Sequence, residues 1–502
     1  MQIMENILSG NKRTIKETVL FLASGLIALF FALTMMNSHL YFYLIVLISY
    51  LLMLFFMGVK GLHLGYLVMV FTLPFVLFIP RSLIGDQLYL QYHFRLALYL
   101  GMLLLWGALF IRKKISIDLT NNKVIFILLF FFMMELASLL YFRGINIPNF
   151  RDSFVFQDIR DQSMSLILFL LTVSLCKSKA NIERVLYVVA ASSPIVIGIG
   201  FFEKLSNYAL FSPRQPYFQE ITQITSTFWD PNHLSRYLVI LILLYLPFYL
   251  FSASSGLWRL VISLLAFILL SFTGSVSGFA SLMVGVMLIL FNRKYFIQMG
   301  KGANDTRKYV LLRGFIWFAL ILLFAVVGSW VFSQFSIYSD IILGKLSMIE
   351  GSARHNLDLA ALQMFAKHPL FGVGFSNYSV LFSSFNPGLN LWALGGTPII
   401  HNSFMSVASE LGVAGLILLF VIYIYFGKIA LMDGKNIQDD LLRRTQISLG
   451  AIWITLIVNS FVYFKFFEDP KVWLVAGLII AINGVHIDQQ ELNREEICAQ
   501  NS

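Results

Sequence analysis

The chain has 502 residues, of which 58% are hydrophobic and only 12% are charged. This balance excludes a soluble domain of that length and indicates a polytopic membrane protein. The formal net charge is +10, but in such a protein the excess of Lys and Arg marks cytoplasmic loops, so we predict no nucleic-acid partner. The two cysteines show no disulfide or metal pattern.

Apolar runs of membrane-spanning length follow one another along the chain. We therefore predict an all-α polytopic membrane protein with about 12–14 transmembrane helices. The predicted spans are residues 17–36, 40–58, 62–80, 94–111, 123–142, 163–176, 185–202, 234–251, 257–273, 276–291, 314–332, 401–426, 446–464 and 470–486.

Basic residues predict the side of the membrane on which each loop lies. Lys12, Arg13 and Lys16 precede the first span, which predicts a cytoplasmic N-terminus. Alternating from there, the other basic clusters also fall inside; they are residues 112–114, 177–184, 293–313 and 443–444. The tail 487–502 is then cytoplasmic too, and we expect it to be flexible.

Three long loops fall on the outer side, and long connections are uncommon unless they are functional. The loops are residues 143–162, 203–233 and 333–400. Any chemistry should therefore use these loops and the helix ends beside them. We predict four parts: N-terminal helices 1–220, a core 221–430 that includes the large extracytoplasmic loop 333–400, C-terminal helices 431–486, and the tail 487–502.

The largest outer loop contains a short helical pattern that begins near Arg354. Its apolar residues recur at helical spacing; they are Leu357, Ala360, Ala361, Met364 and Phe365. Pro369 and Gly372 end the pattern. We predict an amphipathic helix on or near the outer membrane surface. Arg354 either pairs with Asp358 at i+4 or binds a phosphate through its guanidinium.

Residues 225–237 read TSTFWDPNHLSRY and precede a predicted span. Asp230 is a natural N-cap, and Pro231 is a natural first helical residue. The free N–H groups of this helix start could receive an anion. Asn232 lies beside them, either as a simple neighbour of the cap or as a ligand contact.

Residues 398–415 read PIIHNSFMSVASELGVAG and open a long apolar run. His401 can accept a proton at neutral pH, or it is an interfacial histidine that water surrounds; Asn402 follows it. Glu410 lies nine residues further, about 13 Å deeper in a continuous helix and on its opposite face. We therefore expect Glu410 to hold this helix to a neighbour or to line an inner cavity, rather than to orient His401.

Several arginines fall on the predicted outer side, where the positive-inside rule makes them unusual. They are Arg81, Arg95, Arg143, Arg151, Arg160 and Arg214. This set indicates a phosphate-bearing ligand, although ion pairs with Asp152, Asp158 and Asp161 would explain part of it. The histidines show no metal-ligand spacing, so we predict no metal and no cofactor.

Three pieces occur in a fixed order: TFWDPN before one span, HPLFGVGFSNY after Arg354 in the large loop, and HNSFMSVASELGVAG at the next span. In this order and topology they resemble the O-antigen ligase and Wzy polymerase superfamily. That superfamily includes bacterial polysaccharide polymerases and lipopolysaccharide O-antigen ligases. The resemblance is best over residues 220–430.

The resemblance implies a GT-C-like membrane glycosyltransferase with a polyprenyl-diphosphate-linked oligosaccharide as donor. It implies a multi-pass protein of the bacterial plasma (inner) membrane with an extracytoplasmic site. By position, His401 matches the family's essential histidine and Arg354 the arginine of its large loop. We expect Arg214, Asn232 and Asn402 to bind the diphosphate or glycan. Membrane lipids, a flippase and a chain-length regulator are the other expected partners.

The chain departs from the family pattern at two places. Many members have an arginine shortly before the TF-x-x-PN piece, where this chain has Gln223. Many also read S-R-G before the tenth span, where this chain reads TGSVSG with Val276 in the arginine place. The predicted set of phosphate-binding arginines is therefore reduced to Arg354, with Arg214 as a second.

We predict a polysaccharide polymerase that transfers the glycan to the hydroxyl of another lipid-linked repeat. The alternative is an O-antigen ligase that transfers it to lipid A–core. A lipid-linked sugar transporter is a rival from another class. A transporter should show internal repeats and charges in both halves of the membrane, whereas the polar features here concentrate on the outer side. A scaffold in a polysaccharide complex is a third interpretation.

Overall fold

The computed structural model describes residues 40–76, 89–115, 123–141, 154–211, 223–228, 230–251, 256–292, 353–385, 399–461 and 466–501. Within these ranges the regular elements are all helices. They are α3 (Leu40–Met57), α4 (Val59–Thr72), α6 (Tyr89–Ile111), α7 (Lys123–Tyr141), α8 (Phe154–Leu175), α9 (Lys179–Ser206), α10 (Pro231–Phe251), α11 (Leu257–Phe272), α12 (Val276–Phe291), α15 (Ala353–Lys367), α16 (Tyr378–Phe385), α17 (Ser403–Leu431), the 3-10 helix η3 (Asp433–Asn436), α18 (Asp440–Asn459) and α19 (Pro470–Asn501).

The predicted fold class is confirmed: the protein is an all-helical polytopic membrane protein. Among the described residues, five helices are long and apolar enough to cross a membrane, and shorter apolar helices accompany them. The five are α9, α10, α17, α18 and α19. The predicted spans 17–36 and 314–332 lie outside the described residues. Each of the other predicted spans overlaps a helix.

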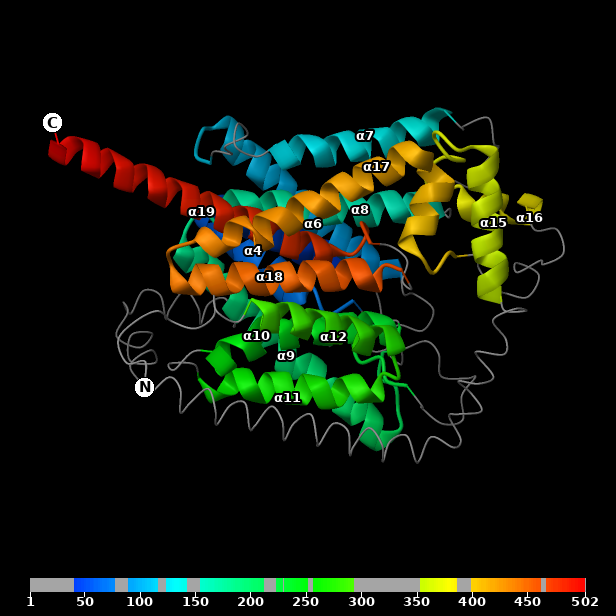
Figure 1. Cartoon of the computed structure of the whole chain (residues 1–502), viewed down its shortest axis with the longest axis horizontal. Coiled ribbons are helices and arrows are strands. Elements are labelled where there is room, and N and C mark those ends of the chain that lie inside the picture. Colours follow the sequence, from blue (N-terminus) through cyan, green and yellow to red (C-terminus); the bar gives the residue numbers. More distant parts are fainter. Residues whose placement is uncertain are drawn as a thin grey trace.

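The long helices form one bundle, and α15 lies across one end of it (Figure 1). Within the bundle, α10 packs against α11, α12 and α18, and α19 packs against α8. We call this end of the bundle, where α17 begins after Asn402 and α18 ends at Asn459, the α15 end. The C-terminus lies at the opposite end, where α19 projects beyond the other helices (Figure 1).

A small hydrophobic core at the α15 end is separate from the large core of the bundle. Four of the five apolar residues of the predicted loop helix are buried in it; they are Leu357, Ala360, Ala361 and Met364. Val373, Tyr378, Phe382 and Ile400 complete this core. The helix that the sequence predicts near Arg354 is therefore confirmed as α15, and its buried face packs on α16 and on the residue before His401.

Two predictions about the ends of helices are wrong. The outer loop predicted at 143–162 is shorter, because α8 already begins at Phe154 and includes Asp158, Arg160 and Asp161. The tail expected to be flexible is helical, because α19 continues to Asn501. Residues 487–501 contain no Gly or Pro and are rich in Gln and Glu, which are residues that favour a helix.

Candidate functional site

Helix α17 is broken near its beginning. Gly412 has φ 65° and ψ −158°, a backbone conformation that is essentially restricted to glycine. The first part of α17 therefore turns away from the rest and lies next to α15 (Figure 1). Glu410 lies in this first part, which does not continue the axis of the helix after Gly412, whereas the sequence predicted a single span over residues 401–426.

The segment after α15 fills this break. In a continuous helix, the N–H groups of Val413 and Ala414 would donate to the carbonyls four residues earlier, at 409 and 410. Here they donate to Pro369 and Leu370, at 2.8 and 3.2 Å. The carbonyls of Ser409 and Glu410 accept instead from residues 373 and 374, at 2.8 and 2.9 Å. The inserted segment thus satisfies the four backbone groups that the break sets free, which would otherwise be left without a hydrogen-bond partner.

Two glycines make this insertion possible. A Cβ on Gly372 would lie 2.2 Å from the backbone carbon of Glu410. A Cβ on Gly412 would lie 2.5 Å from the backbone carbon of Leu370. Each glycine therefore accommodates the backbone of the other segment. The HPLFGVG and ELGVAG pieces, which the sequence shows as separate motifs, form one structural unit.

Glu410 belongs to the same unit. Its buried carboxyl group accepts a hydrogen bond from the N–H of Tyr378, at 3.2 Å. Tyr378 is the first residue of α16. Glu410 therefore holds the segment between α15 and α16 rather than a neighbouring membrane-spanning helix. This partner lies 32 residues earlier in the chain, so a helical wheel of residues 401–426 could not reveal it.

Polar side chains of α7 and α8 hold the other side of the inserted segment. The N–H of Phe375 donates to Ser138 Oγ at 3.0 Å, and Ser376 Oγ donates to Asp158 Oδ2 at 2.6 Å. Nearby, the buried Gln162 amide donates to Glu135. The inserted segment is thus fixed from α7, α8 and α17 together. A glutamate within an apolar run, such as Glu135 in FFFMMELASLL, is the sequence signal of this polar layer.

His401 and Asn402 lie at the α15 end, immediately before α17. The Asn402 side chain accepts the N–H groups of Phe404 and Met405, at 2.9 and 3.2 Å, so it is the N-cap of the helix. His401 is partly exposed. Ile400 is buried in the small core together with Leu357 of α15. The structure therefore brings His401 to the helix that carries Arg354; the Arg354 side chain itself lies outside the described residues.

The start of α10 is held by hydrogen bonds within the protein. Asp230 Oδ1 accepts the N–H and the side-chain amide of Asn232, at 2.8 and 2.9 Å. Asn232 Oδ1 accepts from Ser275 Oγ at 2.7 Å, and Ser275 is the N-cap of α12. The predicted Asp230 cap is confirmed. The Asn232 side chain thus links the start of α10 to the start of α12.

The two positions that depart from the family pattern lie at this same end. Gln223 lies against Gly274: a Cβ added to Gly274 would be 2.8 Å from the side-chain amide nitrogen of Gln223. Val276, two residues later, is 73% exposed. The neutral residues at the two places where the pattern has arginines thus belong to neighbouring segments.

The described outer arginines have partners within the protein. Arg160 Nη2 lies 2.7 Å from Asp161 Oδ1, as the ion-pair interpretation predicts. Arg95 Nη2 donates to the carbonyl of Thr72 at 2.6 Å, at the end of α4. The other arginines of the predicted outer set lie outside the described residues; they are Arg81, Arg143, Arg151 and Arg214.

A buried ion cluster that the sequence analysis missed lies beside the starts of α10 and α19. Arg236 Nη1 lies 2.9 Å from Asp469 Oδ2, and Lys471 Nζ lies 2.8 Å from Asp469 Oδ1. Arg236, Asp469 and Lys471 are 2%, 5% and 7% exposed. Arg236 also donates through Nε and Nη2 to Asn459 Oδ1, at 3.0 and 2.9 Å. These three ionised residues carry one positive charge in excess.

The sequence does contain a signal for this cluster. Asp469 and Pro470 repeat the Asp230–Pro231 pattern of a helix start, and Asp469 Oδ1 accepts the N–H of Lys471 at 3.0 Å. Burial favours the neutral form of Asp469, but the charges of Lys471 and Arg236 hold its pKa well below the usual range. The carboxylate is therefore ionised at neutral pH.

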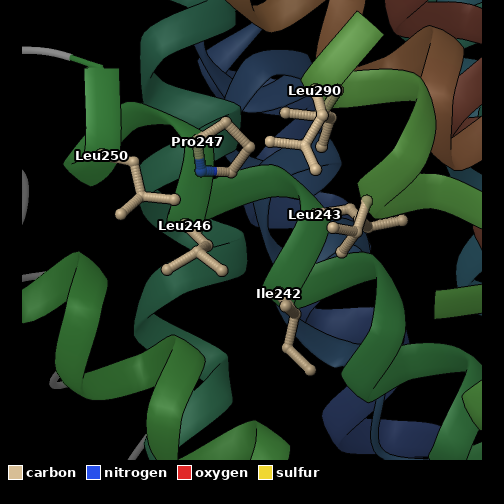
Figure 2. A pocket seen from close by; sticks show the side chains of 8 residues that line it. Ile242, Leu243, Leu246, Pro247, Leu250 and Leu290 are labelled. Atoms are coloured by element: carbon tan, nitrogen blue, oxygen red, sulfur yellow. The ribbon is translucent and has the colours of Figure 1, made fainter. Parts of the chain in front are cut away.

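A hollow between α10 and α12 is lined only by apolar side chains (Figure 2). The lining residues are Ile242, Leu243, Leu246, Pro247, Leu250, Val286, Ile289 and Leu290. They come from the halves of α10 and α12 that are remote from the α15 end. The hollow is therefore not part of the candidate site.

The α15 end thus combines a partly exposed histidine, a broken helix with an inserted segment, and a buried cation-rich cluster. Residues 260–420 match the family model of the O-antigen ligase domain. This part of the chain is similar to the O-antigen ligase family. The match includes α15, the inserted segment and His401, and it confirms the resemblance to the O-antigen ligase and Wzy superfamily.

No curated protein gives a significant match to the chain. The O-antigen ligase domain nevertheless supports a multi-pass membrane glycosyltransferase of the ligase or polymerase type. Substrates of this family are lipid-linked oligosaccharides in the membrane. Most of the membrane-spanning framework, including α18 and α19 with the Asn459 and Asp469 contacts, lies outside the matched residues.

Proposed function

We propose that the chain is a polysaccharide polymerase of the bacterial plasma membrane. It transfers a glycan from a polyprenyl-diphosphate carrier to the hydroxyl of another lipid-linked repeat, at the outer face. The observation that carries this proposal is the position of His401 within the O-antigen ligase domain, partly exposed and beside α15. A proton acceptor at the mouth of the bundle suits an acceptor hydroxyl that approaches from the membrane surface.

In the proposed reaction, His401 accepts the proton of the acceptor hydroxyl while its oxygen bonds to the anomeric carbon of the donor. The bond from that carbon to the carrier diphosphate breaks, and the diphosphate leaves with the bonding electrons. Arg354, and Arg214 as a second cation, stabilise the negative charge that develops on it. Asn232 and Asn402 bond to the protein itself, so we assign them to holding the backbone around the site.

The first experiment tests the acceptor. The purified protein is reconstituted in vesicles with lipid-linked repeats as the sole substrate, and products are separated by length. A polymerase lengthens the chains without any other acceptor. If chains lengthen only after lipid A–core is added, and each transfer ends on that acceptor, the protein is a ligase and the polymerase proposal fails.

The second experiment tests His401. We expect His401→Ala to lower the transfer rate by at least about 100-fold, because a positioned general base contributes that much or more. The matched control is His486→Gln, since His486 lies on α19 away from the α15 end and bonds to Gln490. The control should keep its activity and the same amount of inserted protein. Transfer by His401→Ala at the parent rate would remove His401 from the mechanism.

A further inference from the structure

We propose that Asn459, outside the O-antigen ligase domain, is a positioning residue for His401. This inference rests on the proposed function, because it concerns the placement of the proposed base. Asn459 is the last residue of α18, and its side chain joins the end of this helix to the buried guanidinium of Arg236. The chain of contacts from Asp469 to the start of α17 passes through this amide.

The start of α17 is attached to the end of α18. The N–H of Ser403 donates to the carbonyl of Ser460 at 2.9 Å. The ring of Phe404 stacks on Phe461, with ring centroids 4.2 Å apart. Ser403 and Phe404 thus bind the two residues that directly follow Asn459. His401 lies two residues before Ser403, so the position of Ser460 sets the position of the proposed base.

Asn459 is fixed by a guanidinium that cannot move freely. Two N–H groups of Arg236 converge on Asn459 Oδ1, at 3.0 and 2.9 Å, and a third donates to Asp469 Oδ2 at 2.9 Å. A guanidinium presents these donors in a rigid plane. Asn459 is only 2% exposed, so water cannot replace its bond to Arg236. Asp469 and Arg236 therefore determine the position of the last turn of α18.

Removal of the amide should move the proposed base rather than remove it. In Asn459→Ala, two buried donors of Arg236 lose their acceptor, and the last residue of α18 loses its side-chain link to α10. A displacement of about 1 Å at a reacting group can cost roughly 100-fold in rate. We therefore expect kcat to fall by about that factor, while KM for the lipid-linked donor changes little because no donor contact is lost.

The experiment uses a covalent replacement for the lost attachment. Ser403→Cys and Ser460→Cys are introduced together with Cys498→Ser, which removes the exposed native thiol. Transfer is measured with the cysteines reduced and oxidised, with and without Asn459→Ala. Oxidation should raise kcat of the Asn459→Ala protein to about that of the oxidised protein that keeps Asn459. The reason is that the disulfide holds positions 403 and 460 together.

A second readout does not need turnover. The rate of disulfide formation between the two cysteines, followed by gel mobility, should be lower with Asn459→Ala, because the residues meet less often. A protein without any transferase activity can still show this difference, so failure of the proposed function is distinguishable. Equal rates of disulfide formation with and without Asn459 would overturn the inference.

The matched control removes a similar amide from the same helix. Gln446 is fully buried in α18 and donates to the carbonyl of Ile479 at 3.0 Å, in the half of α18 remote from His401. Gln446→Ala should leave kcat and the disulfide rate unchanged. Three further outcomes overturn the inference: an effect of Asn459→Ala on KM alone, a loss of kcat that oxidation does not restore, and an equal loss of kcat in Gln446→Ala.

Discussion

Asp469 receives three bonds in the buried part of the α15 end. Its two oxygens accept the side chain and the N–H of Lys471, at 2.8 and 3.0 Å, and the guanidinium of Arg236 at 2.9 Å. The charges of these two partners outweigh its burial and keep its pKa low. A neutral residue at this position would leave two buried cations without a counter-ion. The free energy lost in this way is larger than the free energy that the ion pair contributes to stability.

Asp469→Asn should therefore lower the free energy of unfolding by about 3–5 kcal/mol. The pKa of Asp469 in the folded protein lies below its value in the unfolded chain, near 3.9. Its contribution is thus complete above that pH and is lost only as the pH falls toward the folded pKa. Unfolding of both proteins in detergent should show a constant difference from pH 8 to pH 5. A difference that shrinks over this range would contradict the ionised state.

At the scale of elements, α17 and the segment after α15 depend on each other. The break at Gly412 frees four backbone groups, and residues 369–374 bind all of them. A sequence pattern can predict that a helix begins at Asn402, because the N-cap is a local signal. It could not predict the break, because the apolar run continues through Gly412 and the inserted segment comes from about forty residues earlier in the chain.

Gly412→Ala should destabilise the protein, because Ala would have to keep a positive φ and its Cβ would lie 2.5 Å from the Leu370 backbone. The strained conformation alone costs about 1–3 kcal/mol, and the clash adds to it. The matched control is Gly427→Ala in the same helix, where the nearest atom to a Cβ would be 3.7 Å away. This control should gain up to about 1 kcal/mol from helix propensity. Thermal unfolding in detergent measures both; equal stability of the two variants would argue against the inserted segment.

The buried ion cluster shows a second limit of sequence reasoning. Arg236 and Asp469 are separated by 233 residues, so no local spacing connects them. Each residue carries a partial signal: Arg236 is a charge within an apolar helix, and Asp469 precedes a proline at a helix start. The helical framework and α15 could be predicted because their signals are periodic and local. The cluster and the inserted segment could not, because their partners meet only after the bundle has formed.

At the scale of the whole molecule, the basic loops predict that both termini are cytoplasmic and that α15 is outside. The C-terminal end of α19 and α15 lie at opposite ends of the bundle (Figure 1), which agrees with this arrangement. The chain offers natural reporters for a test, because Cys498 is exposed near the C-terminus whereas Cys176 is buried.

A membrane-impermeant maleimide should label Cys498 only after the membrane of spheroplasts is permeabilised. Leu362 of α15 is 46% exposed, so Leu362→Cys in a Cys498→Ser background should react in intact spheroplasts. The Cys498→Ser protein alone should show no label, because Cys176 is buried. Labelling of Cys498 in intact spheroplasts would reverse the orientation and place the proposed site in the cytoplasm.

The reciprocal fit of Gly372 and Gly412 has a consequence for recombination between related proteins. Each segment supplies the backbone partners of the other, and each glycine leaves room for the other chain. A crossover point placed between residues 374 and 409 would combine two halves that had not been selected together. Functional chimaeras should therefore inherit residues 369–414 from one parent, whatever the origin of the surrounding helices.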